Sequence, residues 1–85
     1  MTEEAASRAS DRKLARMAGQ IAGYFSAYPQ ERAVAGVAEH INQFWSAQMR
    51  ADLLALVENA PAMLHPLVIE AAALIRSTQG RRDNS

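Results

Sequence analysis

Histidine and cysteine, the side chains that most often bind metals or act as nucleophiles and bases, are scarce in this sequence. Its 85 residues include no cysteine and two histidines, His40 and His65. Neither histidine has a second histidine four residues away or a glutamate three residues before it, the spacings that place two ligands on one helix face. Without cysteine there is no thiolate ligand, disulfide or thiol nucleophile. We therefore expect no metal site and no cofactor-binding residue in this chain.

Two further signatures of catalysis are missing. The sequence has no Gly-x4-Gly-Lys loop to cradle a nucleotide phosphate. Its serines have no histidine and aspartate at a spacing that would tie them into a catalytic triad. We expect no catalytic residue, and a free-standing helical enzyme is the weaker alternative to a protein that acts by binding another protein.

The charge balance argues against two classes of partner. Nine basic and nine acidic residues give a formal net charge of zero, whereas nucleic-acid binders usually carry a clear positive excess. The start, Met1 to Glu4, lacks the basic and then apolar pattern of a secretory signal. The longest uncharged run, residues 17–30, is too short and too polar to cross a bilayer. We expect a cytoplasmic protein that binds neither nucleic acid nor membrane.

Four side chains stand out as possible partner contacts. His40 falls at the flank of an apolar stripe, where its ring either packs at the domain boundary or meets a partner. Phe44 and Trp45 fall within that stripe, which favours core packing, although tryptophan is also frequent at binding hot spots. Arg50 comes early in a predicted helix, where a cation opposes the helix dipole. It is therefore either solvated or paired with a carboxylate of this chain or of a partner.

Small residues on the outer side of two predicted helices suggest that another backbone approaches closely. Each glycine costs about 1 kcal/mol of helix propensity relative to alanine, and the alternative is that an alanine-rich composition simply tolerates them. The stripe comprises Ala15, Gly19, Ala22, Gly23 and Ser26, with Ala33 and Gly36 in a similar position on the next helix. The candidate partner-binding residues are therefore Gly19, Gly23, Gly36, His40, Phe44, Trp45 and Arg50.

The elements that position these residues follow from apolar periodicity at spacings of three and four. Helices are expected over residues 11–27, 29–45, 47–58 and 66–77. Ser10, Ser46 and His65 are expected at the cap positions and Pro29 in a first turn. The expected core stripes are Leu14, Met17, Ile21, Phe25 and Tyr28; Val34, Val37, Ala38, Ile41, Phe44 and Trp45; Met49, Leu53, Leu56 and Val57; and Leu67, Val68, Ala71, Leu74 and Ile75.

This pattern predicts an all-α protein, a small bundle of four short amphipathic helices. The helical domain is expected over residues 10–77. Residues 1–9 and 78–85 are polar and lack apolar periodicity, so we expect a flexible tail at each end.

The order of these segments resembles a known family. The stretch KLARMAGQIAGYF at residues 13–25 is followed by AVAGVAEHINQFW at 33–45, by Met49-Arg50, and later by Pro66-Leu67-Val68. This arrangement resembles the delta subunit of cytoplasmic, NAD-dependent, molybdenum-containing formate dehydrogenases. The likeness covers about residues 13–75, and the block at 33–45 is its most specific part.

The resemblance implies a non-catalytic accessory subunit that supports assembly or stability of a larger complex. The expected partners are the larger formate dehydrogenase subunits, foremost the molybdenum-containing alpha subunit. Those subunits would hold the molybdenum cofactor, iron–sulfur clusters and FMN, and would oxidise formate to carbon dioxide. The sequence departs from the family at Ser46-Ala47-Gln48, where a basic residue often follows a proline, and at His65, where aspartate is frequent. Any contact made by the missing arginine or aspartate is therefore in doubt.

A small DNA-binding regulator is the main alternative. The second and third predicted helices are joined tightly enough to imitate a helix-turn-helix. The third helix would then read the bases with Gln48, Arg50 and Asp52, a weak set for a chain without net positive charge.

Overall fold

The computed structural model describes residues 2–76, with side chains from Ser10 onward. These residues form four α-helices and two short 3₁₀-helices joined by short connections. The elements are α1 (Thr2–Phe25), α2 (Gln30–Phe44), α3 (Ala47–Asn59), η1 (Pro61–Met63), α4 (Pro66–Ala71) and η2 (Ala72–Leu74). Within these residues there is no strand. The prediction of an all-α fold with four helices is confirmed.

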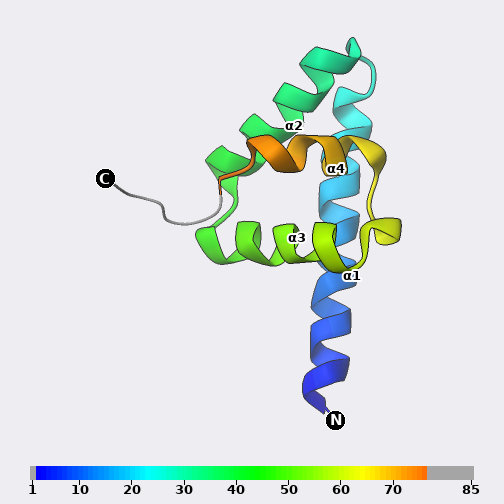
Figure 1. Ribbon diagram of the computed structural model, residues 1–85, viewed down its shortest axis with the longest axis vertical. Helices are drawn as coiled ribbons and strands as arrows, with labels where there is room; N and C mark the ends of the chain where they lie inside the picture. The colour runs from blue at the N-terminus through cyan, green and yellow to red at the C-terminus, as the bar shows by residue number, and fades with distance from the viewer. Residues whose placement is uncertain (1, 77–85) are drawn as a thin grey trace.

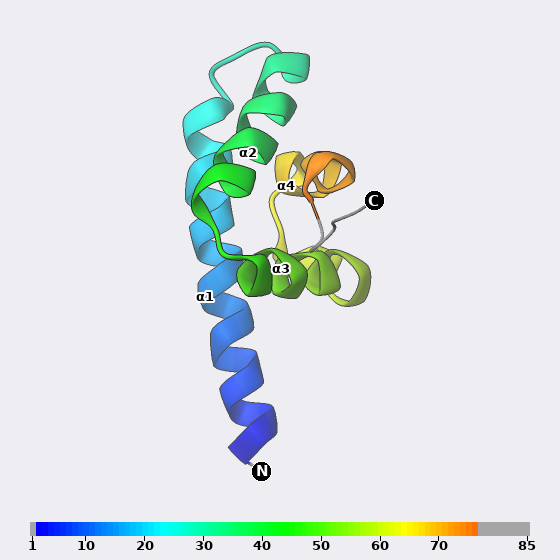
Figure 2. The ribbon, with the colours of Figure 1, turned by 90° about the vertical axis from the view of Figure 1, so that its left-hand side faces the viewer.

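The helices form two layers. α1 and α2 run antiparallel as a hairpin, and α3 and α4 lie across it on one side (Figures 1 and 2). α4 packs mainly on α2, whereas α3 packs on α1. The first half of α1 extends past α3 without a neighbouring helix, as both views show. One face of the hairpin is therefore covered and the other is left without a helical layer.

The core between the layers is built largely from small and aliphatic side chains. Ile41, Leu53, Val37 and Val68 are the largest side chains that are fully buried. The buried set is Leu14, Ala18, Ala22, Ala33, Val37, Ala38, Ile41, Trp45, Leu53, Leu56, Leu64, Leu67, Val68, Ala71 and Ile75. Burial of these groups is the main source of stability, because apolar transfer contributes about 25 cal/mol per Å².

Local capping signals set the starts of α3 and α4. The Ser46 hydroxyl accepts a hydrogen bond from the Met49 amide (3.1 Å), as the sequence predicted. Nδ1 of His65 accepts one from the Leu67 amide (3.0 Å). His65 therefore occupies the cap position of α4, as the sequence predicted, and its Nδ1 satisfies an amide of the first turn. Pro29 precedes α2 as its N-cap residue, one position before the predicted first turn.

The start of α1 differs from the prediction. Ser10 was expected to cap the helix, but α1 begins at Thr2 and Ser10 lies within it, exposed. Residues 2–9 contain three alanines, which favour the helical conformation. They also contain two glutamates near the N-terminus, and negative side chains interact favourably with the positive end of the helix dipole. The predicted start of this helix at Asp11, with Ser10 as its cap, is therefore wrong. The division of the domain at residue 10 stays a prediction, and the predicted tail at 78–85 lies outside the described residues.

Two alanines that were assigned to outer faces lie in the core. Ala22 is fully buried and Ala33 is 1% exposed. Together with Ala18 they let the α1 backbone approach its neighbours closely, since each contributes only a methyl group. Tyr28, predicted on the core stripe, lies beyond the end of α1 and is exposed.

The end of the described chain is fixed by polar contacts that the sequence did not reveal. α4 was expected to reach residue 77, but it ends at Ala71 and continues as η2. Asn42 holds this end, because its Nδ2 donates to the Leu74 carbonyl (3.0 Å) and its Oδ1 accepts from the Arg76 amide (2.8 Å). Leu74 is consequently exposed and does not join the core.

A second polar contact lies at the other end of the α2–α4 contact. The Gln30 amide donates to both carboxylate oxygens of Glu70, each at 2.9 Å. Because Gln30 begins α2 and Glu70 belongs to α4, this exposed contact links the start of α2 to α4.

Candidate functional site

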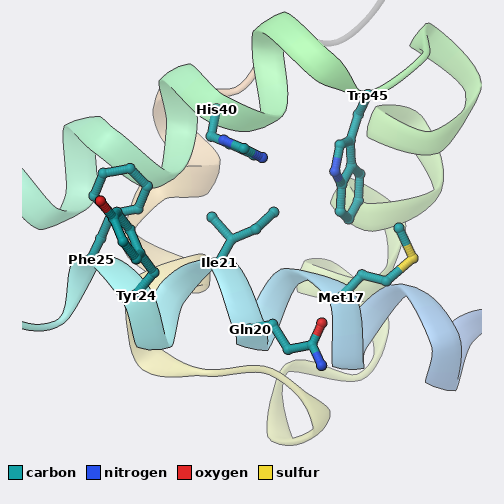
Figure 3. A pocket seen from close by; sticks show the side chains of 7 residues that line it. All are labelled: Met17, Gln20, Ile21, Tyr24, Phe25, His40 and Trp45. Carbon is teal, nitrogen blue, oxygen red and sulfur yellow. The ribbon is translucent and has the colours of Figure 1, made fainter.

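A groove of about 490 Å³ runs between α1 and α2 on the face that α4 leaves uncovered (Figure 3). We call it the aromatic groove. In the close-up, His40 and the Trp45 indole point from α2 toward α1, and α4 lies behind the two helices. The residues that line the groove are Met17, Gln20, Ile21, Tyr24, Phe25, His40 and Trp45.

The helix period brings the α1 side of the groove together. Met17, Ile21 and Phe25 follow one another at intervals of four residues, which places them on one face. All three are half-buried and pack against the edge of the core. On the α2 side, Trp45 is the residue that caps the helix, and its indole is only 7% exposed. The groove floor is therefore continuous with the hydrophobic core.

A second, smaller hollow of about 200 Å³ adjoins the aromatic groove. The two share Phe25 and His40, so they form one continuous surface. We call the second one the outer hollow; its lining residues are Phe25, Gly36, Glu39, His40, Gln43 and Phe44. Neither set of lining residues includes a lysine or an arginine.

Aromatic side chains contact one another along the rim of this surface. Phe25 and Tyr24 meet edge to face with ring centroids 5.0 Å apart, and His40 lies 4.8 Å from the Phe44 ring. The pKa of the Tyr28 phenol is raised, because its hydrogen bond with Tyr24 favours the protonated form and an ionised Tyr24 would repel a second negative charge.

Gly36 is explained by a contact within the chain. A Cβ atom built at Gly36 would lie 2.5 Å from Cδ1 and from Cε1 of Phe25. The Phe25 ring thus rests directly on the α2 backbone, and a glycine is needed for this approach. The sequence suggested that a second backbone approaches Gly36. In the structure, the group that approaches it is an aromatic ring of the same chain.

Gly19 and Gly23 lie away from the aromatic groove. Two residues along an α-helix correspond to about 200° of rotation, so each glycine lies nearly opposite Ile21, which lines the groove. A Cβ built at either glycine meets no atom within 4 Å. The structure therefore separates these two candidates from His40, Phe44 and Trp45, and it does not test whether a partner covers them.

Phe44 corrects the core assignment made for the Phe44-Trp45 pair. Trp45 is buried as expected, but Phe44 is 70% exposed. Phe44 is the last residue of α2, and its ring lies in the outer hollow beside His40. His40 is half-buried and lines both hollows, which agrees with the boundary position predicted for it.

Arg50 is engaged by the backbone of its own chain. Its Nη1 donates to the Trp45 carbonyl (2.9 Å) at the end of α2, and its Nε donates to the Arg76 carbonyl (2.9 Å). A cation is favourable beside such carbonyls at a helix C-terminus. This contact offsets the unfavourable position at the start of α3, so neither an ion pair nor full solvation describes Arg50.

Sequence reasoning did not predict that Met17, Gln20, Ile21, Tyr24 and Phe25 line a groove. Their spacing of three and four residues was visible, but the apolar members were assigned to the core. The signal that distinguishes them is the parallel stripe of alanines, Ala18 and Ala22, which is the one that the neighbouring helices cover.

The side chains that line the two hollows offer apolar contacts and a few hydrogen-bonding groups. Across residues 10–76 no three histidine, aspartate or glutamate side chains gather as metal ligands would. None of the described helices is long and apolar enough to span a membrane.

The side chains of α3 that were proposed to read DNA bases form hydrogen bonds within the chain. The Gln48 amide donates to the Asp52 carboxylate (2.9 Å), and Arg50 is bound to backbone carbonyls as described above. The structure therefore gives no support to the helix-turn-helix alternative.

Comparison with known proteins gives one match. The sequence model of the family described as NADH-dependent formate dehydrogenase delta subunit FdsD matches residues 13–72. No curated protein and no solved structure matches the chain. The matched span includes every residue of the aromatic groove and of the outer hollow.

Proposed function

The chain belongs to the NADH-dependent formate dehydrogenase delta subunit family, since the match covers most of its length, and on this premise we propose that it is a non-catalytic accessory subunit that supports assembly or stability of the enzyme complex. The family match carries the proposal. The exposed apolar surface between α1 and α2 supports it, because such a surface is a property of proteins that bind partners.

The chemistry of the donor groups supports a non-catalytic role. A chain without cysteine has no thiolate for an iron–sulfur cluster. The two histidines belong to different environments: His40 lies in the groove and His65 caps α4 through Nδ1. The cysteine and histidine content of the chain therefore does not fit an iron–sulfur site. The proposal therefore assigns the molybdenum cofactor, the iron–sulfur clusters and FMN to the other subunits.

Within that proposal, the other subunits oxidise formate to carbon dioxide and pass the electrons to NAD. The molybdenum-containing alpha subunit is the proposed partner, and the cytoplasm is the proposed location. The delta chain itself contributes binding surface only.

The experiment compares the complex with and without this chain. The formate dehydrogenase subunits from the same source are co-expressed with the tagged chain or without it, and the yield of assembled complex, its molybdenum content and NAD-dependent formate oxidation are measured. We expect the chain to co-purify with the alpha subunit in a fixed ratio and its omission to lower yield or molybdenum content. Unchanged yield, metal content and activity, with no co-purification, would refute the accessory role.

The isolated chain provides the second arm. We expect it to show no formate oxidation and no retardation of DNA in a low-salt gel-shift assay. Formate turnover by the purified chain alone would contradict the non-catalytic assignment, and salt-sensitive DNA binding would revive the regulator alternative.

A further inference from the structure

Two strongly exposed aromatic side chains stand at the aromatic groove and the outer hollow. Tyr24 on α1 is 68% exposed and Phe44 on α2 is 70% exposed. A single exposed apolar side chain is ordinary on a protein surface. Here, however, the surface that these two rings border is already lined by Met17, Ile21 and Trp45. The apolar groups are thus contiguous, which is the arrangement that marks a binding surface.

The polar groups of the same surface define the charge that a ligand must carry. Gln20, His40 and Gln43 offer hydrogen-bonding groups, and Glu39 is the acidic residue of the outer hollow. No lysine or arginine lines either hollow, so the Glu39 carboxylate gives the surface an acidic edge on its α2 side. An occupant with an apolar centre and a cation at that edge is complementary to it.

The shape of the surface indicates a rod-like occupant. It follows the seam between two antiparallel helices, and the opposite face of the hairpin is already covered by α3 and α4 (Figure 2). A seam between two helices accepts the side-chain ridge of a third helix. Amphipathic helices bind such grooves through side chains at i, i+3, i+4 and i+7.

We infer that the aromatic groove and the outer hollow seat an amphipathic α-helix of another formate dehydrogenase subunit, with aliphatic side chains between Tyr24 and Phe44 and a lysine or arginine beside Glu39. This inference rests on the proposed function, because the helix belongs to the complex that the accessory subunit joins. The bound helix would add a third layer, on the face of the α1–α2 hairpin opposite α3 and α4.

A second copy of this chain fits the surface less well. In a twofold dimer the same patch meets itself. That interface would contain two Glu39 carboxylates and no lysine or arginine from either hollow. It would therefore lack the opposite charge that favours association.

The test measures binding of the full chain to the purified complex of the remaining subunits. Three variants, Tyr24→Ser, Phe44→Ser and Glu39→Lys, alter exposed positions and should leave the helical circular dichroism unchanged. Each is expected to weaken binding about tenfold or more, as loss of a hot-spot contact does. The controls are Met63→Ser and Glu58→Lys, which change an exposed apolar and an exposed acidic residue outside both hollows. They are expected to bind as the unchanged chain does.

A photo-reactive amino acid at position 44 then identifies the occupant. A cross-link to an apolar helical segment of another subunit with a lysine or arginine on its flank supports the inference. A cross-link only to a second copy of this chain, or to a charged loop, overturns it. If the unchanged chain binds the complex and all three groove variants bind equally well, the docking surface is wrong while the accessory role stands. If the unchanged chain does not bind, the proposed function fails as well.

Discussion

Replacing Gly36 by alanine tests the central packing contact of the aromatic groove. In an ordinary helix interior, alanine is about 1 kcal/mol more favourable than glycine. At Gly36, however, the added Cβ would meet two Phe25 ring carbons at 2.5 Å and Cγ at 3.1 Å. The ring must therefore move, and overpacking of this kind costs about 1–3 kcal/mol. We expect Gly36→Ala to lower the free energy of unfolding by about 0–2 kcal/mol.

Gly19→Ala is the matched control. It is the same substitution inside a helix, but no atom lies within 4 Å of the new Cβ. Gly19→Ala should raise the free energy of unfolding by about 1 kcal/mol. The two variants should thus differ by about 1–3 kcal/mol, the cost of moving the Phe25 ring.

The assay is urea unfolding followed by circular dichroism. For a domain of this size the denaturant dependence is about 1 kcal/mol per molar urea, so the two midpoints should be separated by about 1–3 M. Combining Gly36→Ala with Phe25→Ala should remove the clash and restore the gain of about 1 kcal/mol, which a double-mutant cycle measures. If Gly36→Ala is as stabilising as Gly19→Ala when Phe25 is present, the ring does not rest on Gly36 and the described groove is incorrect.

Two further substitutions test a polar contact at the end of the described chain and a buried side chain of the core. Asn42→Ala removes the hydrogen bonds to the Leu74 carbonyl and from the Arg76 amide, so the free energy of unfolding should fall by about 1–2 kcal/mol and the Arg76 amide should exchange faster with deuterated water. An unchanged unfolding midpoint would show that Asn42 does not hold this end of the chain. Trp45→Ala removes a side chain that is 7% exposed and should cost about 3–5 kcal/mol, enough to unfold so small a domain. A variant with unchanged helical circular dichroism and midpoint would place the indole outside the core.

Several features of this protein were determined by the sequence alone. The apolar spacing of three and four residues predicted four helices, because the α-helical period is local and independent of neighbouring elements. Ser46 as the N-cap of α3 was likewise a local signal, and it is confirmed. The family was recognisable from its order of motifs and is confirmed over residues 13–72.

Local signals were insufficient at the ends of α1 and α4. Ser10 has the chemistry of a cap, but the residues before it favour helix as well, so α1 continues to Thr2. The early end of α4 depends on Asn42, which lies on another helix. A contact between residues more than 30 positions apart leaves no periodic trace in the sequence.

Only the tertiary structure decided which face of α1 is the core. The helix carries two adjacent apolar arcs: small side chains at Ala18 and Ala22, and large ones at Met17, Ile21 and Phe25. Helical periodicity gives the angle between these arcs but not the direction from which the other helices approach. Those helices pack on the alanines, where the backbones come closest, and the larger side chains are left half-buried along the groove. The same packing explains why Gly36 contacts Phe25 while Gly19 and Gly23, identical in type and also helical, lie on the opposite side of α1.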